Sequence, residues 1–291
     1  MTAKESAGLC AEIARANRLR ALLARGATYF FLALGAVVML FPFFWMFTSA
    51  FKTPQEVATF PPRWLPAAPR FENFATVFEK APFGIYFLNS ALITAASVAG
   101  TGLVTILAAF AFSRLKFPGR NLLFTLLLSL MMIPFEMLVI TNYETIAAWR
   151  LIDNRLSLFI PFLGSIFYTY ILRNFFLSIP DGLYWSARVD GAGNWTYLWK
   201  VMVPIARPAL TTIVLLNAIT SWNSFMWPML VINSTANRTL PLGLYVFMTE
   251  GGINFELLMA ASTVVVLPII LLFLIARKQI VGGVARGGMK G

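Results

Sequence analysis

The side chains that usually carry covalent chemistry are scarce in this chain of 291 residues. Histidine is absent, and the single cysteine, Cys10, has no second cysteine in the chain with which to form a disulfide. No Cys or carboxylate cluster has metal-ligand spacing, and no glycine-rich phosphate loop of the type G-x-x-x-x-G-K-[ST] occurs. We therefore expect no catalytic residue, no metal site and no cofactor on this chain.

Five polar or aromatic side chains in apolar segments form the first candidate site. Glu136 follows Pro134 in such a segment, where an ionisable group is costly unless it faces a cavity or a partner. Amides and an indole could line a path for a solute with hydroxyl groups, and these residues are Asn142, Asn217, Trp222 and Asn223. Two alternatives stay open. Glu136 could only tune its helix position beside a water-filled vestibule, and the asparagines could hydrogen-bond between helices, which we favour for Asn217 and Asn223.

The second candidate site is a polar hairpin between two apolar segments, from Tyr184 to Leu210. Its sequence predicts a short helix, a break at Asp190-Gly191, a second short helix and a restart of the chain at two prolines. Glycine allows a sharp turn and the close approach of another chain, and Asp190 is expected to cap the following helix. A membrane protein with such a hairpin is expected to dock a partner there, and a plain surface turn is the alternative.

Six apolar runs must position these residues. Of all residues, 59% are hydrophobic and only 12% are charged, against roughly 25% charged in soluble domains. A helix needs about 20 apolar residues to cross a bilayer core of roughly 30 Å. Six runs meet that length: Thr28–Phe51, Leu88–Phe112, Asn121–Asn142, Leu156–Leu177, Ala209–Ile232 and Leu257–Ala276. We predict an all-α integral membrane protein with one six-span domain over residues 28–276, in preference to a large soluble helical core.

The net charge of +11 is distributed unevenly. Sixteen of the 23 Lys and Arg residues, but only four of the 12 acids, lie in the N-terminal arm, the 113–120 loop, the 173–208 segment and the tail after residue 276. By the positive-inside rule these segments face the cytoplasm. Residues 1–27 are predicted to form an amphipathic basic arm, and residues 277–291 a basic tail. The excess charge then orients the chain and attracts anionic membrane lipid, so nucleic acid is not an expected partner.

The hairpin resembles the cytoplasmic EAA loop of binding-protein-dependent ABC importer permeases, whose pattern is E-A-A-x-x-D-G-A, an aromatic-rich stretch and Pro-x-x-x-Pro. The matching residues are Ala187, Asp190, Gly191, Ala192, Pro204 and Pro208. Two further blocks resemble the maltose-transporter (MalG-like) branch, which handles sugars and related polyols: Ser49–Pro54 with Pro61–Trp64, and Trp222–Pro228 with Thr239–Leu244. The resemblance covers nearly the whole chain. Trp185 stands where the family has a glutamate, so Trp185 would have to replace that polar contact by burial.

The resemblance implies a permease subunit of an ATP-driven importer in a prokaryotic plasma (inner) membrane, and not an enzyme. The solute would be a sugar or sugar-like molecule of the oligosaccharide, disaccharide or glycerol-phosphate type. The implied partners are a second homologous permease, an external solute-binding protein and two ATPase subunits, which would hold ATP and Mg. The residues expected to couple ATPase closure to alternating access are Ala187, Arg188, Asp190, Gly191 and Ala192, although Arg188 could also be a solvated charge.

Two predicted external loops are candidates for contact with the binding protein. Maltose-type permeases use the loop that corresponds to residues 233–255 to displace solute. Its tip, Glu250-Gly251-Gly252, allows close approach of a backbone, although a plain connecting turn is the alternative. The 52–84 loop holds six prolines among aromatic residues. These make it stiff and suited to an interface between water and lipid headgroups or to a protein partner.

Two rival function classes are less favoured. A secondary, ion-coupled transporter would want inverted repeats or intramembrane ion ligands, and Glu136 is the one candidate acid within a predicted span. A membrane-embedded enzyme would want a nucleophile with its base, or metal ligands, inside the bilayer. The absence of histidine and the position of Cys10 in the arm argue against such an enzyme.

Overall fold

In the part of the chain that the structure describes, three helices are long and apolar enough to cross a membrane. The computed structural model describes residues 3–249 and 252–287. The three helices are α1 (Ala3–Ser49), α4 (Phe83–Arg114) and α14 (Phe255–Gly287). Their apolar stretches cover Arg20–Ser49, Phe83–Arg114 and Phe255–Leu274. Helices α1 and α14 continue without a break through the described parts of the predicted arm and tail.

The other three predicted spans each overlap a bent helix pair, and the last of these pairs begins within the predicted hairpin. Helices α5 (Arg120–Leu130) and α6 (Phe135–Ala148) meet at 100°. The 3-10 helices η1 (Arg155–Leu158) and η2 (Ile160–Phe162) meet α7 (Ile166–Leu177) at 47°. The segment Asn194–Ile205 meets α11 (Arg207–Trp222) at 79°. If each bent pair counts as one span, the described residues provide up to six, which agrees with the predicted all-α membrane fold.

Prolines account for breaks that the predicted runs did not contain. Pro134 lacks an N–H and disfavours helical backbone at the preceding residue. Helix α5 accordingly ends at Leu130, before this proline, and α6 begins directly after it. Pro228 likewise cannot donate the bond that would extend α11, which ends at Trp222 before α12 (Met226–Val231) begins. The prediction of continuous helices over 121–142 and 209–232 is therefore wrong at these two points. The predicted run over 156–177 is also broken, because η1 and η2 precede α7, which begins at Ile166.

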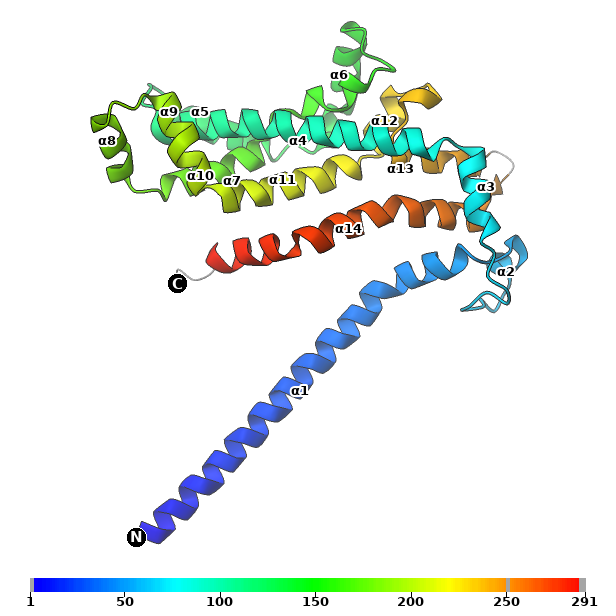
Figure 1. Cartoon of the computed structure of the whole chain (residues 1–291), viewed down its shortest axis with the longest axis horizontal. Helices are drawn as coiled ribbons and strands as arrows, with labels where there is room; N and C mark the ends of the chain where they lie inside the picture. Colours follow the sequence, from blue (N-terminus) through cyan, green and yellow to red (C-terminus); the bar gives the residue numbers. More distant parts are fainter. Residues whose placement is uncertain (1–2, 250–251, 288–291) are drawn as a thin grey trace.

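Short elements occupy the two ends of the bundle. Figure 1 shows α8, α9 and α10 at one end and α2 and α3 at the other. The first group, which we call the hairpin end, comprises α8 (Asp181–Val189), α9 (Asn194–Tyr197), the π-helical turn η3 (Leu198–Met202) and α10 (Val203–Ile205). The remaining elements are α2 (Pro54–Ala58), α3 (Glu72–Lys80), η4 (Thr235–Asn237), α13 (Leu240–Gly243), η5 (Leu244–Phe247), β1 (Met248–Thr249) and β2 (Gly252–Ile253).

Helix α4 lies at the centre of the bundle. It packs against α7 and α11, and α11 in turn packs against α14, so these helices run side by side (Figure 1). Helix α1 contacts α14 but leaves the bundle, and its residues 20–44 are exposed. An exposed apolar helix of this length is unstable in water, so this face of α1 requires a bilayer or another membrane helix.

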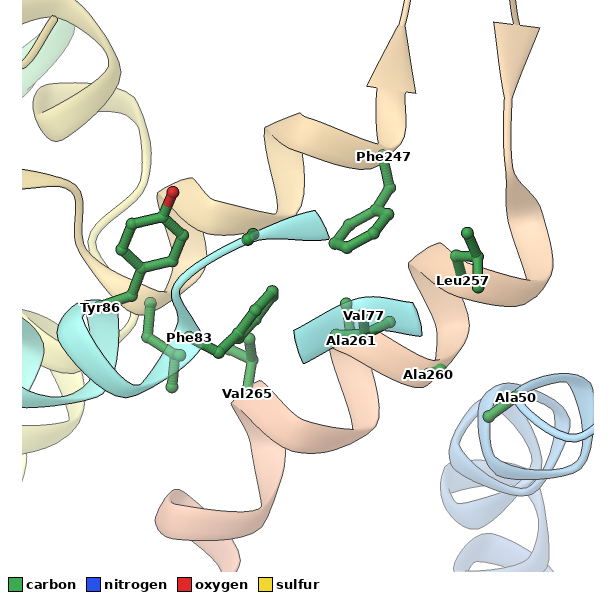
Figure 2. Close-up of a cluster of buried hydrophobic side chains, with 11 residues drawn as sticks. Ala50, Val77, Phe83, Tyr86, Phe247, Leu257, Ala260, Ala261 and Val265 are labelled. Carbon is green, nitrogen blue, oxygen red and sulfur yellow. The ribbon is translucent and has the colours of Figure 1, made fainter. Parts of the chain in front are cut away.

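A buried cluster joins the elements of the end that carries α2 and α3. Figure 2 shows Phe83 and Tyr86 of α4 beside Phe247 of η5 and the small residues Ala260 and Ala261 of α14. The backbone approaches closely here: a Cβ added at Gly243 of α13 would lie 2.5 Å from the Tyr86 ring. The sequence Thr239–Leu244 thus packs a glycine against a fully buried aromatic ring.

Candidate functional site

Helix α8 of the hairpin ends in a left-handed turn at Gly191. Gly191 has a φ of 82°, which residues with a Cβ rarely adopt. Its N–H bonds the carbonyl of Arg188 at 3.1 Å, and the N–H of Ala192 bonds the carbonyl of Ala187 at 2.8 Å. These two bonds form a Schellman motif, which satisfies carbonyls at the end of a helix. The predicted break at this position is therefore a turn that depends on glycine.

The prediction that Asp190 caps the following helix is wrong. Asp190 is the C-terminal cap of α8, and the cap of α9 is Gly193, without a side-chain bond. The reason is the turn at Gly191, which leaves three residues between Asp190 and the start of α9. The exposed carboxylate instead sits at the C-terminal end of a helix, where the helix dipole disfavours negative charge. A cation from outside the chain would be attracted to it.

Buried side chains fix the inner side of the hairpin to the bundle. Tyr197, Leu198 and Met202 are fully buried in a cluster with residues of α4 and α7. Ala187 of α8 packs against the same cluster. The Tyr184 ring meets Tyr197 edge-on, with 5.1 Å between the ring centroids. Ala187, predicted as a coupling residue, therefore supports the hairpin from inside.

The outer side of the hairpin exposes bulky apolar side chains. Val189 is 88% exposed, Trp195 63% and Trp185 60%. Arg188 and Asp190 are exposed between them. We call Trp185, Arg188, Val189, Asp190 and Trp195 the outer hairpin face. Large exposed apolar groups of this kind mark protein contact sites. Trp185, which stands where the family has a glutamate, is exposed and can be buried by a partner.

Sequence analysis missed the residue that ties the hairpin to α4. Arg114 ends α4, and its side chain is only 8% exposed. Its Nη1 donates to Oδ1 of Asp181 in the first turn of α8, and its Nη2 donates to the carbonyls of Phe176 at 2.8 Å and Ile179 at 2.5 Å. One guanidinium thus joins the ends of α4 and α7 to the start of α8. In the sequence, Arg114 is only a basic residue after an apolar run, and the positive-inside rule already explains a basic residue at that place.

A cleft of about 1350 Å³ opens beside the base of the hairpin. The 113–122 loop, with Lys116 and Arg120, forms one wall. Asp181, Tyr184, Trp185 and Asn194 form the other. The cleft therefore offers cationic and aromatic groups on the same side as the outer hairpin face.

A second cleft, of about 560 Å³, lies between α4, α7 and α11 and includes one of the five predicted path residues. That residue is Asn217, whose Oδ1 accepts a bond from Ser97 Oγ at 3.2 Å. This is the bond between helices that the sequence analysis favoured for Asn217. The lining also contains Thr220 and Ser221, which went unpredicted because single hydroxyls in apolar runs carry little signal.

The other four predicted path residues lie outside the lining of this cleft. Glu136 is exposed in the first turn of α6, and Asn142 is partly buried further along that helix. Trp222 donates weakly to the Val265 carbonyl at 3.5 Å and so joins α11 to α14. Asn223 is exposed at the end of α11. A role for these four residues in a solute path stays a prediction.

Of the predicted binding-protein contact, Glu250 and Gly251 lie outside the described residues. Gly252 belongs to β2, where it pairs with Thr249 of β1. Strand β2 is followed directly by α14.

Polar bonds within the chain hold the bundle end opposite the hairpin. Oδ1 of Asp153 accepts bonds from the N–H groups of Asn233 at 3.1 Å and Ser234 at 2.9 Å, and from the Ser234 hydroxyl at 2.9 Å. These bonds, above all that from the Ser234 N–H, lower the pKa of Asp153. Nδ2 of Asn89 donates to the carbonyls of Ala236 and Arg238 at 2.8 and 2.9 Å.

The comparison with known families covers the hairpin and most of the bundle. The model of the family described as binding-protein-dependent transport system inner membrane component matches residues 102–285. That range includes the hairpin, the wall residues of α7 and α11, and nearly all of α14.

Two relatives and one solved structure are similar over most of the chain. The arabinooligosaccharides transport system permease protein AraQ of Bacillus subtilis (strain 168) is 29% identical over 267 residues, 91% of this chain and 95% of its own. The sulfoquinovosyl glycerol transport system permease protein SmoH of Agrobacterium fabrum is 31% identical over 254 residues, 87% of this chain and 89% of its own. A crystal structure of a bacterial ABC transporter involved in the import of alginate, an acidic polysaccharide, shares the fold, with a TM-score of 0.77, 24% identity and coverage of 87% and 94%.

Proposed function

We propose that this chain, which belongs to the family of binding-protein-dependent transport system inner membrane components, is the permease subunit of an ATP-driven importer. The named relatives belong to transport systems for arabinooligosaccharides and sulfoquinovosyl glycerol. The proposed solute is accordingly a sugar or sugar-like molecule of the oligosaccharide, disaccharide or glycerol-phosphate type. A secondary, ion-coupled transporter is not favoured, because the family depends on a binding protein.

The outer hairpin face carries the proposal. A glycine-dependent turn holds it in place, and its inner side is buried in the bundle. An ATPase subunit that covers Trp185, Val189 and Trp195 would remove apolar surface from water, and full burial of a large side chain contributes about 1.5–3 kcal/mol. Asp190 and Arg188 would supply charged contacts at the rim of the same interface.

The coupling mechanism follows from how the hairpin is fixed. When ATP closes the pair of ATPase subunits, the outer hairpin face moves with one of them. Arg114 and the buried Tyr197 cluster transmit that movement to α4 and α7, which contribute Ser97 and the first turn of α7 to the lining of the 560 Å³ cleft. The ATPase subunits must make different contacts in the two states for this movement to change access. ATP and Mg are held by those subunits, and this chain performs no bond chemistry.

The other proposed partners are a second homologous permease, an external binding protein and membrane lipid. The exposed length of α1 fits a lipid or permease contact. In Figure 1 the first residues of α1 and the last described turns of α14 lie towards the same end of the molecule as α8. This arrangement supports a cytoplasmic location for both termini and for the hairpin.

Purification tests the proposal directly. A tagged chain should bring an ATPase and a second permease with it, and solute-loaded binding protein should stimulate ATP hydrolysis by the complex. The matched pair is Val189→Ser on the outer hairpin face and Leu122→Ser on the far wall of the neighbouring cleft. The first should release the ATPase and the second should retain it. Solute accumulation by the chain alone, driven by an ion gradient without ATP, would establish the secondary-transporter alternative instead.

Uptake by cells that lack the chain would identify the solute class. A panel of disaccharides, oligosaccharides, polyols and glycerol phosphates should show loss of uptake for one class only, with recovery when the chain is restored. Labelling of Cys10 tests the orientation, since a reagent that cannot cross the membrane should reach it only after the cells are opened.

A further inference from the structure

The 59–71 segment, between α2 and α3, exposes large apolar side chains. Phe60 is 92% exposed, Phe71 71%, Leu65 64% and Trp64 57%. The described part of the chain leaves more than half of the surface of each of these residues uncovered. Single exposed apolar residues are ordinary, but four within a dozen positions form a surface that usually contacts something other than water.

Polar contacts hold this segment in a fixed position. Nζ of Lys52 is fully buried beneath it and donates to the Arg63 carbonyl at 2.7 Å. A carboxylate oxygen of Glu56 accepts the N–H of Ala67 at 2.9 Å, and the Phe51 carbonyl accepts the N–H of Arg70 at 3.0 Å. The apolar surface is thus a built feature of the loop.

The segment folds back along α1. The Trp64 ring lies edge-on to Phe41, with 5.7 Å between centroids, and to Trp45, with 6.2 Å. Figure 1 shows the chain after α2 returning beside the end of α1. Phe41 precedes Ser49, the last residue of α1, by eight positions, which corresponds to about 12 Å along a helix axis. Along the axis of α1, Trp64 therefore lies beside a part of the helix that precedes the C-terminal end of α1.

The length of α1 places that level within the bilayer. Residues 26–49 are 24 residues without a charge, and as a helix they extend about 36 Å, more than the hydrocarbon core of roughly 30 Å. With Arg25 at the cytoplasmic headgroups, the core ends several residues after Phe41. Trp64 then lies near the outer boundary of the hydrocarbon, where tryptophan is enriched in membrane proteins.

The backbone of the segment suits this environment. Pro61, Pro62, Pro66 and Pro69 have no N–H groups, so four donors that would otherwise need partners are missing. The N–H groups of Ala67 and Arg70 are bonded to Glu56 and to the Phe51 carbonyl. The remaining N–H groups need water or lipid headgroups as partners, which the membrane interface supplies and the hydrocarbon core does not.

We propose that the 59–71 segment is an interfacial anchor that lies in the outer leaflet and binds phospholipid. Phe60, Trp64 and Leu65 contact the upper acyl chains, and Arg63 reaches the phosphate layer. Lipid is the occupant because this surface continues the exposed apolar surface of α1 around Phe41, which a bilayer covers. The anchor would fix the outer end of α1 while the hairpin end moves. The inference rests on the external location of this loop in the proposed function.

Collision measurements on nitroxide labels test the anchor. The full importer, with Cys10→Ser and no other reactive cysteine, is placed in phospholipid nanodiscs with a label at Leu65→Cys or Phe60→Cys. Glu79→Cys, on the exposed side of α3, is the matched control in water. Collision rates with oxygen, which concentrates in the bilayer, and with a water-soluble nickel chelate are then compared. We expect the oxygen-to-nickel ratio to be several-fold higher at positions 60 and 65 than at position 79.

Each outcome decides the question. A ratio at positions 60 and 65 equal to that at position 79 would place the segment in water and overturn the proposal. Low rates with both reagents would show a protein cover, namely the second permease, or the binding protein if they appear only when it is added. Retained uptake by the labelled importers establishes that the variants are folded. Failure of the chain to capture an ATPase would refute the proposed function but leave the measured depth unchanged, so the two ideas fail separately.

Discussion

The two ends of the bundle satisfy their polar groups in opposite ways. At the end opposite the hairpin, Asp153 accepts three bonds from Asn233 and Ser234, and Asn89 donates to two carbonyls of the following loop. At the hairpin end the ties between helices centre on Arg114, and the outer hairpin face stays exposed. The polar groups at Asp153 and Asn89 are thus paired within the chain, whereas the outer hairpin face presents apolar side chains beside charges that form no ion pair in the described part of the chain.

This difference indicates where the molecule is completed by a partner. Polar groups that are paired within the chain gain little from a further contact, whereas exposed tryptophans gain most from burial. We therefore expect substitutions at the hairpin to change coupling while the fold persists. Substitutions at the opposite end should change stability first. Four predictions test this contrast, from the largest effect to the smallest.

The largest effect is expected from Gly191→Pro. Proline fixes φ near −65°, whereas Gly191 has a φ of 82°, and proline also lacks the N–H that bonds Arg188. The turn between α8 and α9 cannot form, so the outer hairpin face loses its shape. Transport should be lost, while the chain still inserts in the membrane and pairs with the second permease. Uptake assays and copurification measure the two properties.

Gly191→Asn is the matched control for this variant. A Cβ at Gly191 meets no atom within 4 Å, so the cost of a side chain here is backbone strain alone. Left-handed backbone costs an ordinary residue about 1–2 kcal/mol, and asparagine tolerates it best. Gly191→Asn should keep most of the transport. Normal transport by Gly191→Pro would show that the hairpin is not the coupling element.

Gly243→Val should have the next largest effect, and on folding. Its Cβ would lie 2.5 Å from the Tyr86 ring, which is fully buried and cannot withdraw. Overpacking a core of this kind costs about 1–3 kcal/mol. The variant should accumulate poorly in the membrane and unfold at a lower temperature. Gly84→Ala, where nothing lies within 4 Å of the added Cβ, should match the native chain. Native accumulation of Gly243→Val would mean that this end is less tightly packed than the structure has it.

Arg114→Ala should reduce coupling several-fold and leave insertion intact. The variant removes the tie between α4, α7 and α8, while the buried Tyr197 cluster still holds the hairpin to the bundle. The ATPase should stay bound, but less solute should enter per ATP hydrolysed, because hairpin motion no longer reaches α4 fully. The ratio of uptake to hydrolysis measures this loss.

Lys116→Gln is the control for the loss of charge, since Lys116 is exposed on the adjoining loop. It should preserve the ratio of uptake to hydrolysis. Arg114→Lys keeps the charge but cannot reach all three acceptors, so its ratio should fall between those of the native chain and Arg114→Ala. An unchanged ratio in Arg114→Ala would show that the buried cluster alone transmits the movement.

The sequence predicted the apolar runs and the hairpin because each rests on local chemistry. Bilayer thickness sets the length of a span, and Asp190-Gly191 marks a turn by residue type alone. The breaks at Pro134 and Pro228 were visible as prolines, but a proline inside a long apolar run can also remain within a helix, as Pro42 does in α1. Local sequence therefore leaves each such position undecided.

The contacts between distant segments could not be predicted in this way. Arg114 bonds residues 62 to 67 positions away, and Asn217 bonds Ser97 across 120 positions. Which helix faces which depends on packing of the whole bundle, and a single sequence carries no direct record of it. The same limit applies to the weak bond from Trp222 to the Val265 carbonyl, which joins α11 to α14 and leaves no mark in the local sequence.

The smallest effect is expected from Asp153→Asn, and its pH dependence identifies the cause. Asp153 has a φ of 57°, which aspartate and asparagine both tolerate, so the variant changes the charge with little change in backbone strain. Because the pKa of Asp153 is lowered in the fold, its carboxylate stabilises the protein above the unfolded value of about 3.9, and this contribution is lost as the pH falls through the folded pKa. An amide does not titrate.

At pH 7 the Asp153→Asn variant should therefore be less stable than the native chain by about 1 kcal/mol, and the difference should shrink below about pH 4. Thermal unfolding of both proteins at pH 7 and below pH 4 measures this change, while uptake at pH 7 should remain near native. A difference that is constant with pH would mean that the bonds to Asn233 and Ser234 stabilise this end without help from the charge.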